Sequence, residues 1–446
     1  MSRYKSYPQY EKSKLQWADR TPKHWNSVHL RWIAKLYAGG TPSKAIEEYW
    51  KNGSVPWINS GEVSQGLISE VSTYITEAAY KNSSAKWIPK NALVMALAGQ
   101  GKTKGMIAQL AIDATCNQSM AAIVPQDLQN SRYLFWWLHS NYQNIRNMAG
   151  GDLRDGLNLE LLGDIGCPIP NVEEQLSIAA FLDHETAKID VLIEKQLRLI
   201  ELLKEKRQAV ISHAVTKGLN PNAPMKDSDV DWLGEVPAHW TVCRLKHAIK
   251  SGSSISYGIV QPGEPLDDGV PFVQTTNMSR GSFGIDDLQK TTKEIAAAYP
   301  RSTLEGGEVI LGIRASIGAA HVVPESLKGV NLSRGVARIT PGMSLLSSYL
   351  VLFFGTDAVS RYWELSKQGS TFSEVSIETV REMSLLIPPK SEQLEIEKSI
   401  KQRLSKMDVV LNLAVNKVSL LQERRTAVIS AAVTGKIDVR DWQAAA

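Results

Sequence analysis

The chain consists of two copies of one long unit. The segments 174–216 and 392–434 align without a gap, and about 18 of roughly 43 aligned positions are identical. A second pair of similar segments, WADRTPKHW at 17–25 and WLGEVPAHW at 232–240, lies upstream at nearly the same separation. Two copies are too few for a solenoid, in which each repeat packs only on its neighbours. The repeat therefore predicts an internal pseudo-dimer.

Each copy begins with a globular part that mixes short β-type runs with helical stretches, a pattern that predicts an α+β fold. Glycine, proline and asparagine separate these runs in both copies. The expected elements keep one order: strands over 54–59, 92–97 and 120–124 with a helix over 132–148 in the first copy, and strands over 270–275, 308–313 and 336–339 with a helix over 347–365 in the second.

A long helix follows each globular part. Proline precedes each helix, at Pro170 and Pro389, and glycine follows it, at Gly218 and Gly435, as is typical of helix ends. Apolar residues recur in alternating steps of four and three, which predicts the seam of a coiled coil. The seam positions are Ile178, Leu182, Ile189, Leu192, Leu199, Leu203 and Val210, then Ile396, Ile400, Met407, Val410, Leu421 and Val428.

A second apolar stripe on both helices, which includes Leu197 and Val415, suggests a further protein partner along their flank. A helix of about 47 residues is roughly 70 Å long. Two such helices from a head-to-tail repeat satisfy both copies when they pack antiparallel about a pseudo-two-fold axis. The expected division of the chain is a globular part at 1–167, a helix at 168–218, a linker and second globular part at 219–385, a helix at 386–437 and a tail at 438–446.

Composition narrows the class of protein. A hydrophobic fraction of 43% and a charged fraction of 22% are ordinary for a globular protein. The chain has no apolar run long enough for a membrane span and no signal peptide, so we expect a cytoplasmic protein. Its three cysteines show no metal-type spacing and are expected to be free thiols. The net charge of +4 permits nucleic-acid binding without requiring it.

Several motifs together resemble one family. The helices begin with PNVEEQ at 170–175 and PKSEQ at 389–393, and they end with KRQAVIS at 206–212 and RRTAVIS at 424–430. Pro-x-His-Trp stands at 22–25 and at 237–240. With these motifs the whole chain resembles the specificity subunit of type I DNA restriction–modification enzymes.

This resemblance implies that each globular part is a target-recognition domain, and that the two domains read the halves of a split, asymmetric site in double-stranded DNA. It also implies that the helices set the spacing and dock two methyltransferase subunits, onto which two restriction–translocase subunits assemble. The chain itself is then expected to be non-catalytic and to hold no cofactor or metal, while S-adenosylmethionine, ATP and magnesium serve the partner subunits.

Matching loops of the two copies differ in sequence, which predicts two different half-sites. Their side chains are suited to base edges and phosphates, because amides fit adenine, arginine fits guanine, and lysine and hydroxyl groups fit phosphate. The candidate DNA-binding residues are Asn59, Gln100, Lys102, Thr103, Lys104, Asn117, Gln118 and Arg154 in the first copy, and Thr275, Asn277, Arg314, Ser316, Asn331, Arg334, Lys367 and Thr371 in the second. The competing interpretation is a solvated loop or a routine turn for most of them. It is a surface salt bridge for Arg314 and an ordinary helix-to-strand connection for the loops of Arg154 and Lys367.

Residues with catalytic chemistry are not evident in the sequence. ALAGQGKT at 96–103 is a degenerate match to a phosphate-binding loop: its first glycine is missing and the second copy lacks the Lys-Thr pair. His24 and His239 are expected to pack rather than react. Two alternatives to the leading interpretation remain open at this point: a specificity subunit for a methyltransferase without a nuclease partner, and an adaptor whose domains bind proteins.

Overall fold

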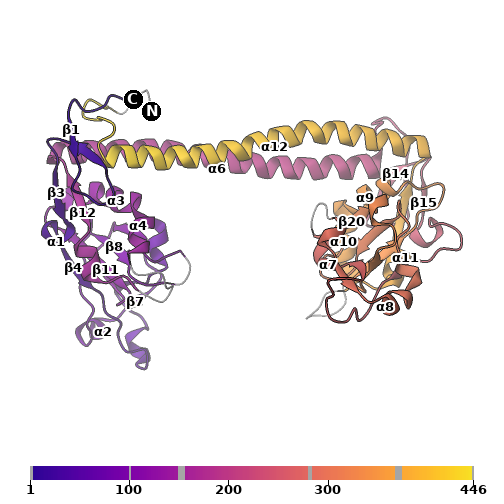
Figure 1. Cartoon of the computed structure of the whole chain (residues 1–446), viewed down its shortest axis with the longest axis horizontal. Helices are drawn as coiled ribbons and strands as arrows, with labels where there is room; N and C mark the ends of the chain where they lie inside the picture. Colours follow the sequence, from indigo (N-terminus) through magenta and orange to yellow (C-terminus); the bar gives the residue numbers. More distant parts are fainter. Residues whose placement is uncertain (1–3, 100–101, 149–155, 280–283, 367–373, 444–446) are drawn as a thin grey trace. The chain divides into compact units, whose positions relative to one another are not determined.

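The computed structural model describes residues 4–99, 102–148, 156–279, 284–366 and 374–443. The chain divides into two compact units. Unit 1 comprises Met1–Gln196 and Asn416–Ala446, and unit 2 comprises Leu197–Val415. Each unit therefore holds one globular part together with segments of both long helices (Figure 1).

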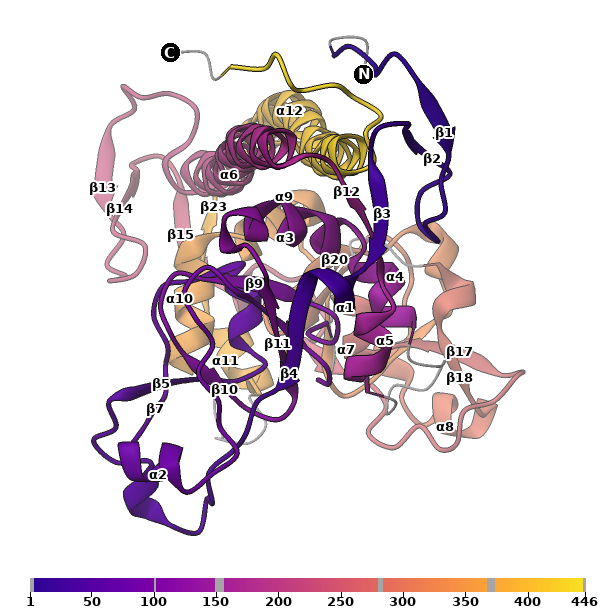
Figure 2. The ribbon, with the colours of Figure 1, turned by 90° about the vertical axis from the view of Figure 1, so that its left-hand side faces the viewer.

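The globular part of unit 1 is built around a five-stranded sheet in the order β4-β11-β8-β9-β6. Helix α3 (Ser131–Ser140) lies between this sheet and the first long helix (Figure 2). The strands of this sheet are β4 (Ala34–Ala38), β11 (Met120–Pro125), β8 (Leu93–Ala96), β9 (Ile107–Leu110) and β6 (Leu67–Ile68). A second sheet contains β10 (Thr115–Cys116), β5 (Val55–Ile58) and β7 (Tyr74–Ile75). Two further pairs are β1 (Tyr10–Lys12) with β2 (Arg20–Pro22), and β12 (Gly166–Ile169) with β3 (Asn26–His29). The shorter helices are α1 (Leu30–Ile33), α2 (Glu77–Lys81), α4 (Tyr142–Asn147) and α5 (Leu159–Gly163).

The globular part of unit 2 repeats this plan with a four-stranded sheet in the order β16-β22-β19-β20. Its strands are β16 (Ser256–Tyr257), β22 (Val336–Ile339), β19 (Val309–Gly312) and β20 (Ala320–Val322). A second sheet contains β18 (Gln289–Thr291), β17 (Val270–Val273) and β21 (Asn331–Leu332). Two further pairs are β13 (Met225–Asp227) with β14 (Glu235–Pro237), and β15 (Thr241–Arg244) with β23 (Ser384–Ile387). The shorter helices are α7 (Thr275–Met278), α8 (Lys293–Ala297), α9 (Ser347–Phe354), α10 (Asp357–Ser366) and α11 (Ile377–Glu382).

The predicted α+β class is confirmed, and the six strands expected from the sequence are present as β5, β8, β11, β17, β19 and β22. Each of the two expected helices is instead a pair of helices. The first breaks at Asn141, whose side-chain amide donates to the Trp137 carbonyl at 2.9 Å and so competes with the helical pattern. The second breaks after Phe354, at Gly355 and Thr356, where glycine favours a helix end.

The two long helices are α6 (Val172–Lys217) and α12 (Lys390–Val433), and they pack together. Within unit 1, Arg425 of α12 forms a two-pronged ion pair with Asp190 of α6, at 2.8 and 3.2 Å. Within unit 2, Arg207 of α6 lies 3.7 Å from Asp408 of α12. The basic residues near the ends of these helices are thus at least partly used to bridge one helix to the other.

A junction of the same three parts holds the long helices in each unit: a glutamate at the start of one helix, a Pro-x-His-Trp segment, and the glycine that follows the other helix. In unit 1 the Glu174 carboxylate at the start of α6 accepts hydrogen bonds from the Trp25 indole at 3.0 Å and from Tyr7, and His24 Nε2 lies 3.0 Å from it. In unit 2 the Glu392 carboxylate accepts from the Trp240 indole at 3.0 Å and lies 2.8 Å from His239 Nε2.

The glycine after the other long helix completes each junction. Gly435 packs against Pro22 and Trp25 in unit 1, and Gly218 packs against Trp240 and Glu392 in unit 2. Both glycines have left-handed φ angles, +70° and +78°, which end the helices as the sequence predicted. The Pro-x-His-Trp motifs are therefore docking points for helix ends, and their histidines are structural.

The coiled-coil seam is shorter than the heptad pattern predicts. Ile178, Leu182 and Ile189 are buried on α6, as are Ile396, Ile400 and Leu421 on α12. Leu192 and Val410, which we expected in the seam, are 42% and 44% exposed, and Leu199 is 37% exposed. The reason is geometric, because a pair of helices covers only one side of each helix. The remaining apolar surface is left uncovered by this chain.

The tail after α12 folds back on the N-terminal segment within unit 1. The Asp438 amide donates to the Lys5 carbonyl at 2.8 Å, and the Tyr10 hydroxyl donates to the Gly435 carbonyl at 2.9 Å. Trp442 packs edge-on against Phe181 of α6. In unit 2 the chain runs on directly from Gly218 to β13.

Cys116, Cys167 and Cys243 are free thiols, and the first two are buried. Among the described residues, none of the helices has a stretch that is both long and apolar enough to span a bilayer.

Candidate nucleic-acid interface

The candidate loops converge at one edge of each globular part, held by the same backbone hydrogen bonds in both units. In unit 1 these bonds run from Asn117 N to Ile58 O at 3.0 Å, from Leu97 N to Ser119 O at 2.8 Å and from Leu157 N to Leu97 O at 2.8 Å. In unit 2 they run from Ser333 N to Val273 O at 2.9 Å, from Ile313 N to Gly335 O at 2.9 Å and from Val375 N to Ile313 O at 2.8 Å. We call residues 59–61, 102–104 and 117–119 the loop cluster of unit 1, and residues 275–279, 314–316 and 333–335 the loop cluster of unit 2.

A glycine closes the frame behind each loop cluster. A Cβ atom at Gly39 would lie 2.1 Å from the Cys116 carbonyl oxygen, and one at Gly258 would lie 1.7 Å from the Leu332 carbonyl oxygen. Only glycine fits where two backbones approach so closely. The supporting frame is therefore the same in both units, although the side chains it presents are different.

The loop cluster of unit 2 presents two arginines to solvent. Arg314 Nε lies 3.9 Å and Arg334 Nη2 lies 3.6 Å from the same Glu374 carboxylate oxygen, and all three side chains are 31–45% exposed. Exposed ion pairs of this kind contribute about 0–1 kcal/mol, so a nucleic acid can displace them at little cost. Between Arg314 and Ser316, Ala315 has φ +56°, a left-handed angle that is unfavourable for alanine and common near functional sites.

Hydroxyl groups surround the two arginines. The Ser316 hydroxyl donates to the Thr275 carbonyl at 2.7 Å and lies 2.8 Å from the Ser279 hydroxyl. The Thr275 methyl group packs beneath Gly335. Thr275, Arg314, Ser316 and Arg334, four residues predicted from three separate segments, are thus brought together.

The loop cluster of unit 1 presents amide and amine groups instead. Lys102 and Gln118 are exposed, Thr103 is half-buried, and the Gln118 side chain bonds to the Thr41 hydroxyl. The Tyr142 hydroxyl donates to the Lys102 carbonyl and so ties this loop to α4. We expected Lys104 at the loop tip, but it is only 6% exposed and therefore does not lie there.

Four predicted asparagines support the loops with their side chains. Asn59 accepts from the Gly61 amide at 2.8 Å, and Asn117 accepts from the Ser119 amide at 3.1 Å, as routine turn residues do. Asn277 is 6% exposed and caps α7 by accepting from the Gln274 amide at 2.9 Å. Asn331 is 1% exposed and bonds to Ser302 and to the Ala296 carbonyl.

The other candidates, Gln100, Arg154, Lys367 and Thr371, lie outside the described residues. Among the residues that the structure describes, no group of three or more His, Cys, Asp and Glu side chains could hold a metal ion.

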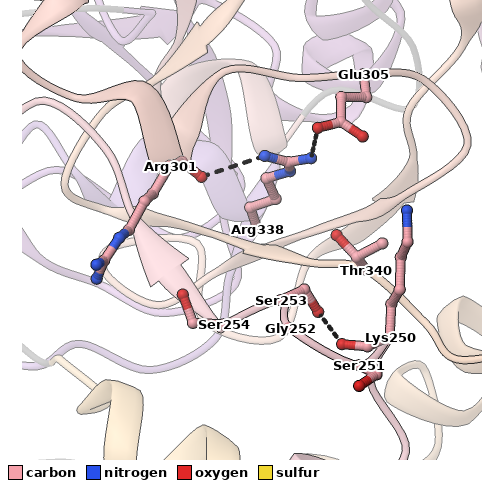
Figure 3. Close-up of a pocket in the computed structure, with 9 residues that line it drawn as sticks. All are labelled: Lys250, Ser251, Gly252, Ser253, Ser254, Arg301, Glu305, Arg338 and Thr340. Carbon is pink, nitrogen blue, oxygen red and sulfur yellow. Dashed lines mark hydrogen bonds and ion pairs between the residues drawn. The ribbon is translucent and has the colours of Figure 1, made fainter.

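A basic hollow in unit 2 was missed by sequence reasoning (Figure 3). It has a volume of about 540 Å³ and is lined by Lys250, residues 251–254, Arg301, Glu305, Arg338 and Thr340. Arg338 is engaged by Glu305 at 3.1 Å and by Glu308 at 3.2 Å, and the bond from Arg338 is the main reason that the pKa of Glu305 is lowered. Its lining comes from three separate segments that share no motif, so no sequence signal links them.

Exposed apolar residues recur at equivalent helix positions in the two units. On the first half of each helix they are Leu176, Val191 and Leu192 in unit 1, and Leu394, Val409 and Val410 in unit 2. On the opposite helix of each unit they are Leu420 and Leu202, which are also equivalent positions. Each unit thus exposes the same set of four, and the sets are 41–63% and 44–59% exposed by residue. Their recurrence at equivalent positions of both units suits a protein partner that meets each unit in the same way.

Comparisons with known proteins agree on one family. The family model described as the type I restriction modification DNA specificity domain matches residues 22–202 and 248–410. The chain is similar to the type I restriction enzyme EcoBI specificity subunit of Escherichia coli, with 23% identity over 94% of this chain and 87% of that one. It is also similar to the MjaVIII specificity subunit of Methanocaldococcus jannaschii, with 22% identity over 95% of each chain.

Two solved structures share the fold. A chain from a study of complex assembly and conformational transition of the type I R-M system has a TM-score of 0.72 at 18% identity, covering 94% of this chain and 99% of that one. The HsdS subunit from Thermoanaerobacter tengcongensis has a TM-score of 0.54 at 16% identity, covering 94% and 98%. The chain therefore belongs to the type I restriction–modification DNA specificity family, as a non-catalytic specificity subunit.

Proposed function

We propose that the two units read the two halves of a split, asymmetric site in double-stranded DNA, each through its own loop cluster. The observation that carries this proposal is the pairing of an equivalent backbone frame with different side chains. Phosphate contacts fix the register of a protein on DNA, whereas contacts to base edges carry the sequence information. Two frames of one shape with different side chains suit two half-sites of different sequence.

In unit 2 the contacts fall to Arg314 and Arg334, with Ser316 and Thr275 beside them. Arginine bonds the O6 and N7 edge of guanine with two hydrogen bonds, and it also pairs with phosphate. In unit 1 the exposed Lys102 and Gln118, with Thr103, suit phosphate and adenine edges. The buried Asn277 and Asn331 contribute by holding the loops in place.

The paired apolar sets on the helices support a complex with two copies of one partner protein. We propose that these partners are methyltransferase subunits that modify adenine with S-adenosylmethionine. Two restriction–translocase subunits that use ATP and magnesium would join them, in the cytoplasm, as a defence against phage. This chain holds no cofactor in that assembly.

The test is to co-produce this chain with the methyltransferase subunit encoded beside it and to map methylated adenines across the host genome by long-read sequencing. One motif with two defined parts separated by an unspecified spacer is the expected result. A stable complex that methylates without sequence preference would contradict the proposal and favour the adaptor function. A methylated motif without any restriction of foreign DNA would indicate a methyltransferase-only system.

Arg334→Ala tests the arginine pair directly. Loss of one good arginine contact costs about 1–3 kcal/mol, so the complex should bind its cognate site about tenfold to a hundredfold more weakly. Arg361→Ala, an exposed arginine of α10, is the matched control and should change binding by less than about twofold. Titration of labelled duplex by fluorescence anisotropy measures both, and equal losses for the two variants would contradict the assignment.

A further inference from the structure

Helices α3 and α9 occupy equivalent places in the two units but present side chains of very different size. Their sequences, SRYLFWWLH from residue 131 and SSYLVLFFG from residue 347, share the Ser-x-Tyr-Leu start. Buried positions of the two helices match closely, since Tyr133 and Tyr349 are 1% and 0% exposed. The positions that face the long helices differ: Arg132, Phe135, Trp136 and His139 in unit 1 are replaced by Ser348, Val351, Leu352 and Gly355 in unit 2.

In unit 1 these large side chains fill the space between α3 and α6. Arg132 Nε and the Trp136 indole both donate to the Asp183 carboxylate of α6, at 2.7 and 2.9 Å. The Arg132 guanidinium carbon lies 4.5 Å from the centre of the Phe135 ring, and the His139 ring stacks on Phe135 with 5.4 Å between the ring centres. Trp136 is only 3% exposed, so this space is closed by the chain's own residues.

In unit 2 the corresponding space, between α9 and α12, is an open groove of about 420 Å³. Its floor is apolar, and Val322, Leu352 and Ile400 contribute to it. Val322 of β20 is 39% exposed, whereas its equivalent in unit 1, Gln109, is 9% exposed and bonds to Arg132. The groove thus marks the volume that Trp136 and Arg132 occupy in the other unit.

The charge at the rim is also reversed. Lys401 of α12 stands at the position equivalent to Asp183, and its side-chain amine forms no ion pair or hydrogen bond with any described residue. The two acidic groups of the rim are already engaged, because Glu397 accepts from the Ser348 hydroxyl at 2.8 Å and Asp408 lies 3.7 Å from Arg207. A partner segment that complements the charge of the groove rim therefore carries a carboxylate that can pair with Lys401.

We propose that this groove docks a segment of the methyltransferase partner that presents a large apolar side chain next to a carboxylate. The inference rests on the proposed function for the identity of the partner. The apolar side chain fills the volume that Trp136 fills in unit 1, and the carboxylate pairs with Lys401. The complex with two partner copies is then asymmetric, because only the copy at unit 2 inserts a side chain here.

Two variants and a matched control test the groove in the full-length chain co-produced with the methyltransferase subunit. Lys401→Asp removes the cation, and Leu352→Trp fills the groove with this chain's own side chain. Lys398→Asp makes the same charge change at an exposed position of α12 that does not line the groove. Native mass spectrometry over a concentration series counts the bound subunits, and thermal unfolding of each variant checks that it is folded.

Both groove variants should weaken one of the two partner copies at least tenfold, while Lys398→Asp should stay within about twofold of the wild type. Carbodiimide cross-linking, which joins an amine to a carboxylate in contact with it, should link Lys401 to a partner peptide that contains a large apolar residue. Wild-type affinity for both copies in both folded variants, or equal losses in all three, would overturn the docking site. Failure of the wild-type chain to bind the methyltransferase at all would overturn the proposed function instead.

Discussion

At the residue scale, Glu174 and Glu392 explain why the most recognisable motifs of the chain stand where they do. Each carboxylate forms hydrogen bonds with the His and Trp side chains of a Pro-x-His-Trp segment that lies about 150 residues earlier in the sequence. Burial and the hydrogen bond to Glu174 both raise the pKa of Tyr7, so its hydroxyl remains a proton donor to that carboxylate. The sequence showed both halves of this junction without showing that they touch.

Glu174→Ala should destabilise unit 1 by about 2–4 kcal/mol, since it leaves buried donors on Trp25 and Tyr7 without an acceptor. The equivalent change at Glu392, whose side chain is 22% exposed, should cost about 1–2 kcal/mol because water can replace it. Urea unfolding followed by circular dichroism measures both. Glu173→Ala, at an exposed neighbouring position, is the control, and a loss as large as that of Glu174→Ala would refute the junction's role.

His139 gives unit 1 a pH dependence that unit 2 lacks at the equivalent Gly355. Burial is the main reason that its pKa falls from 6.5 to about 4, and the charges of Arg425 and Arg132 lower it further. As the pH falls, the unfolded chain therefore binds a proton before the folded chain does. The stability that depends on neutral His139 is present above pH 6.5 and is lost progressively down to about pH 4.

His139→Phe keeps a ring stacked on Phe135 and should flatten this part of the stability profile by up to about 3 kcal/mol. Urea unfolding at a series of pH values between 4 and 7 provides the measurement. His247→Phe changes an exposed histidine in unit 2 and should leave the profile as it is in the wild type. An unchanged slope in His139→Phe would show that other groups set the acid sensitivity.

At the scale of elements, the sequence was most informative at residues such as glycine and proline, which restrict the backbone to conformations that end a helix. Glycine and proline marked both helix ends, and the repeat placed equivalent strands in both copies. Heptad spacing was less reliable, because it predicts which residues share a face and not how much of that face a partner helix covers. Leu192, Leu199 and Val410 were assigned to the seam for that reason and are exposed.

Site residues were harder to predict than elements, since residue type does not fix the direction of a side chain. Asn277 and Arg314 both follow buried strands, yet one caps a helix and the other points toward Glu374 at the surface. The hollow beside Arg338 and the groove beside Lys401 depend on segments far apart in the sequence. Only the fold brings their residues together.

The long helices are expected to set the spacing between the half-sites. Inserting one heptad into α6 after Lys195 and one into α12 after Leu413 keeps the apolar faces in phase and adds roughly 10 Å to each helix. Because a base pair occupies about 3.4 Å, the unspecified spacer should lengthen by about three base pairs. Long-read mapping of methylated sites reads the spacer directly, and an unchanged spacer in an active complex would mean that the helices do not set it.

At the scale of the whole molecule, the repeat is the feature from which the rest follows. Duplication supplies two frames with the same backbone hydrogen bonds, two junctions built on Glu174 and Glu392, and two equivalent apolar sets on the helices. The copies differ in the side chains of their loop clusters, in the number of strands in the main sheet, and at the groove in unit 2. Assembly on the helices therefore follows from what the copies share, DNA specificity from the loop clusters in which they differ, and the asymmetry of the assembly from the groove in unit 2.

The most direct test replaces residues 1–167 with the corresponding domain of another specificity subunit and maps methylated adenines in the resulting complex. Each unit should act independently in reading DNA, so one half of the recognised motif should change while the other half and the spacer stay the same. A change in both halves, or in neither half while methylation continues, would contradict the claim that each unit reads one half-site.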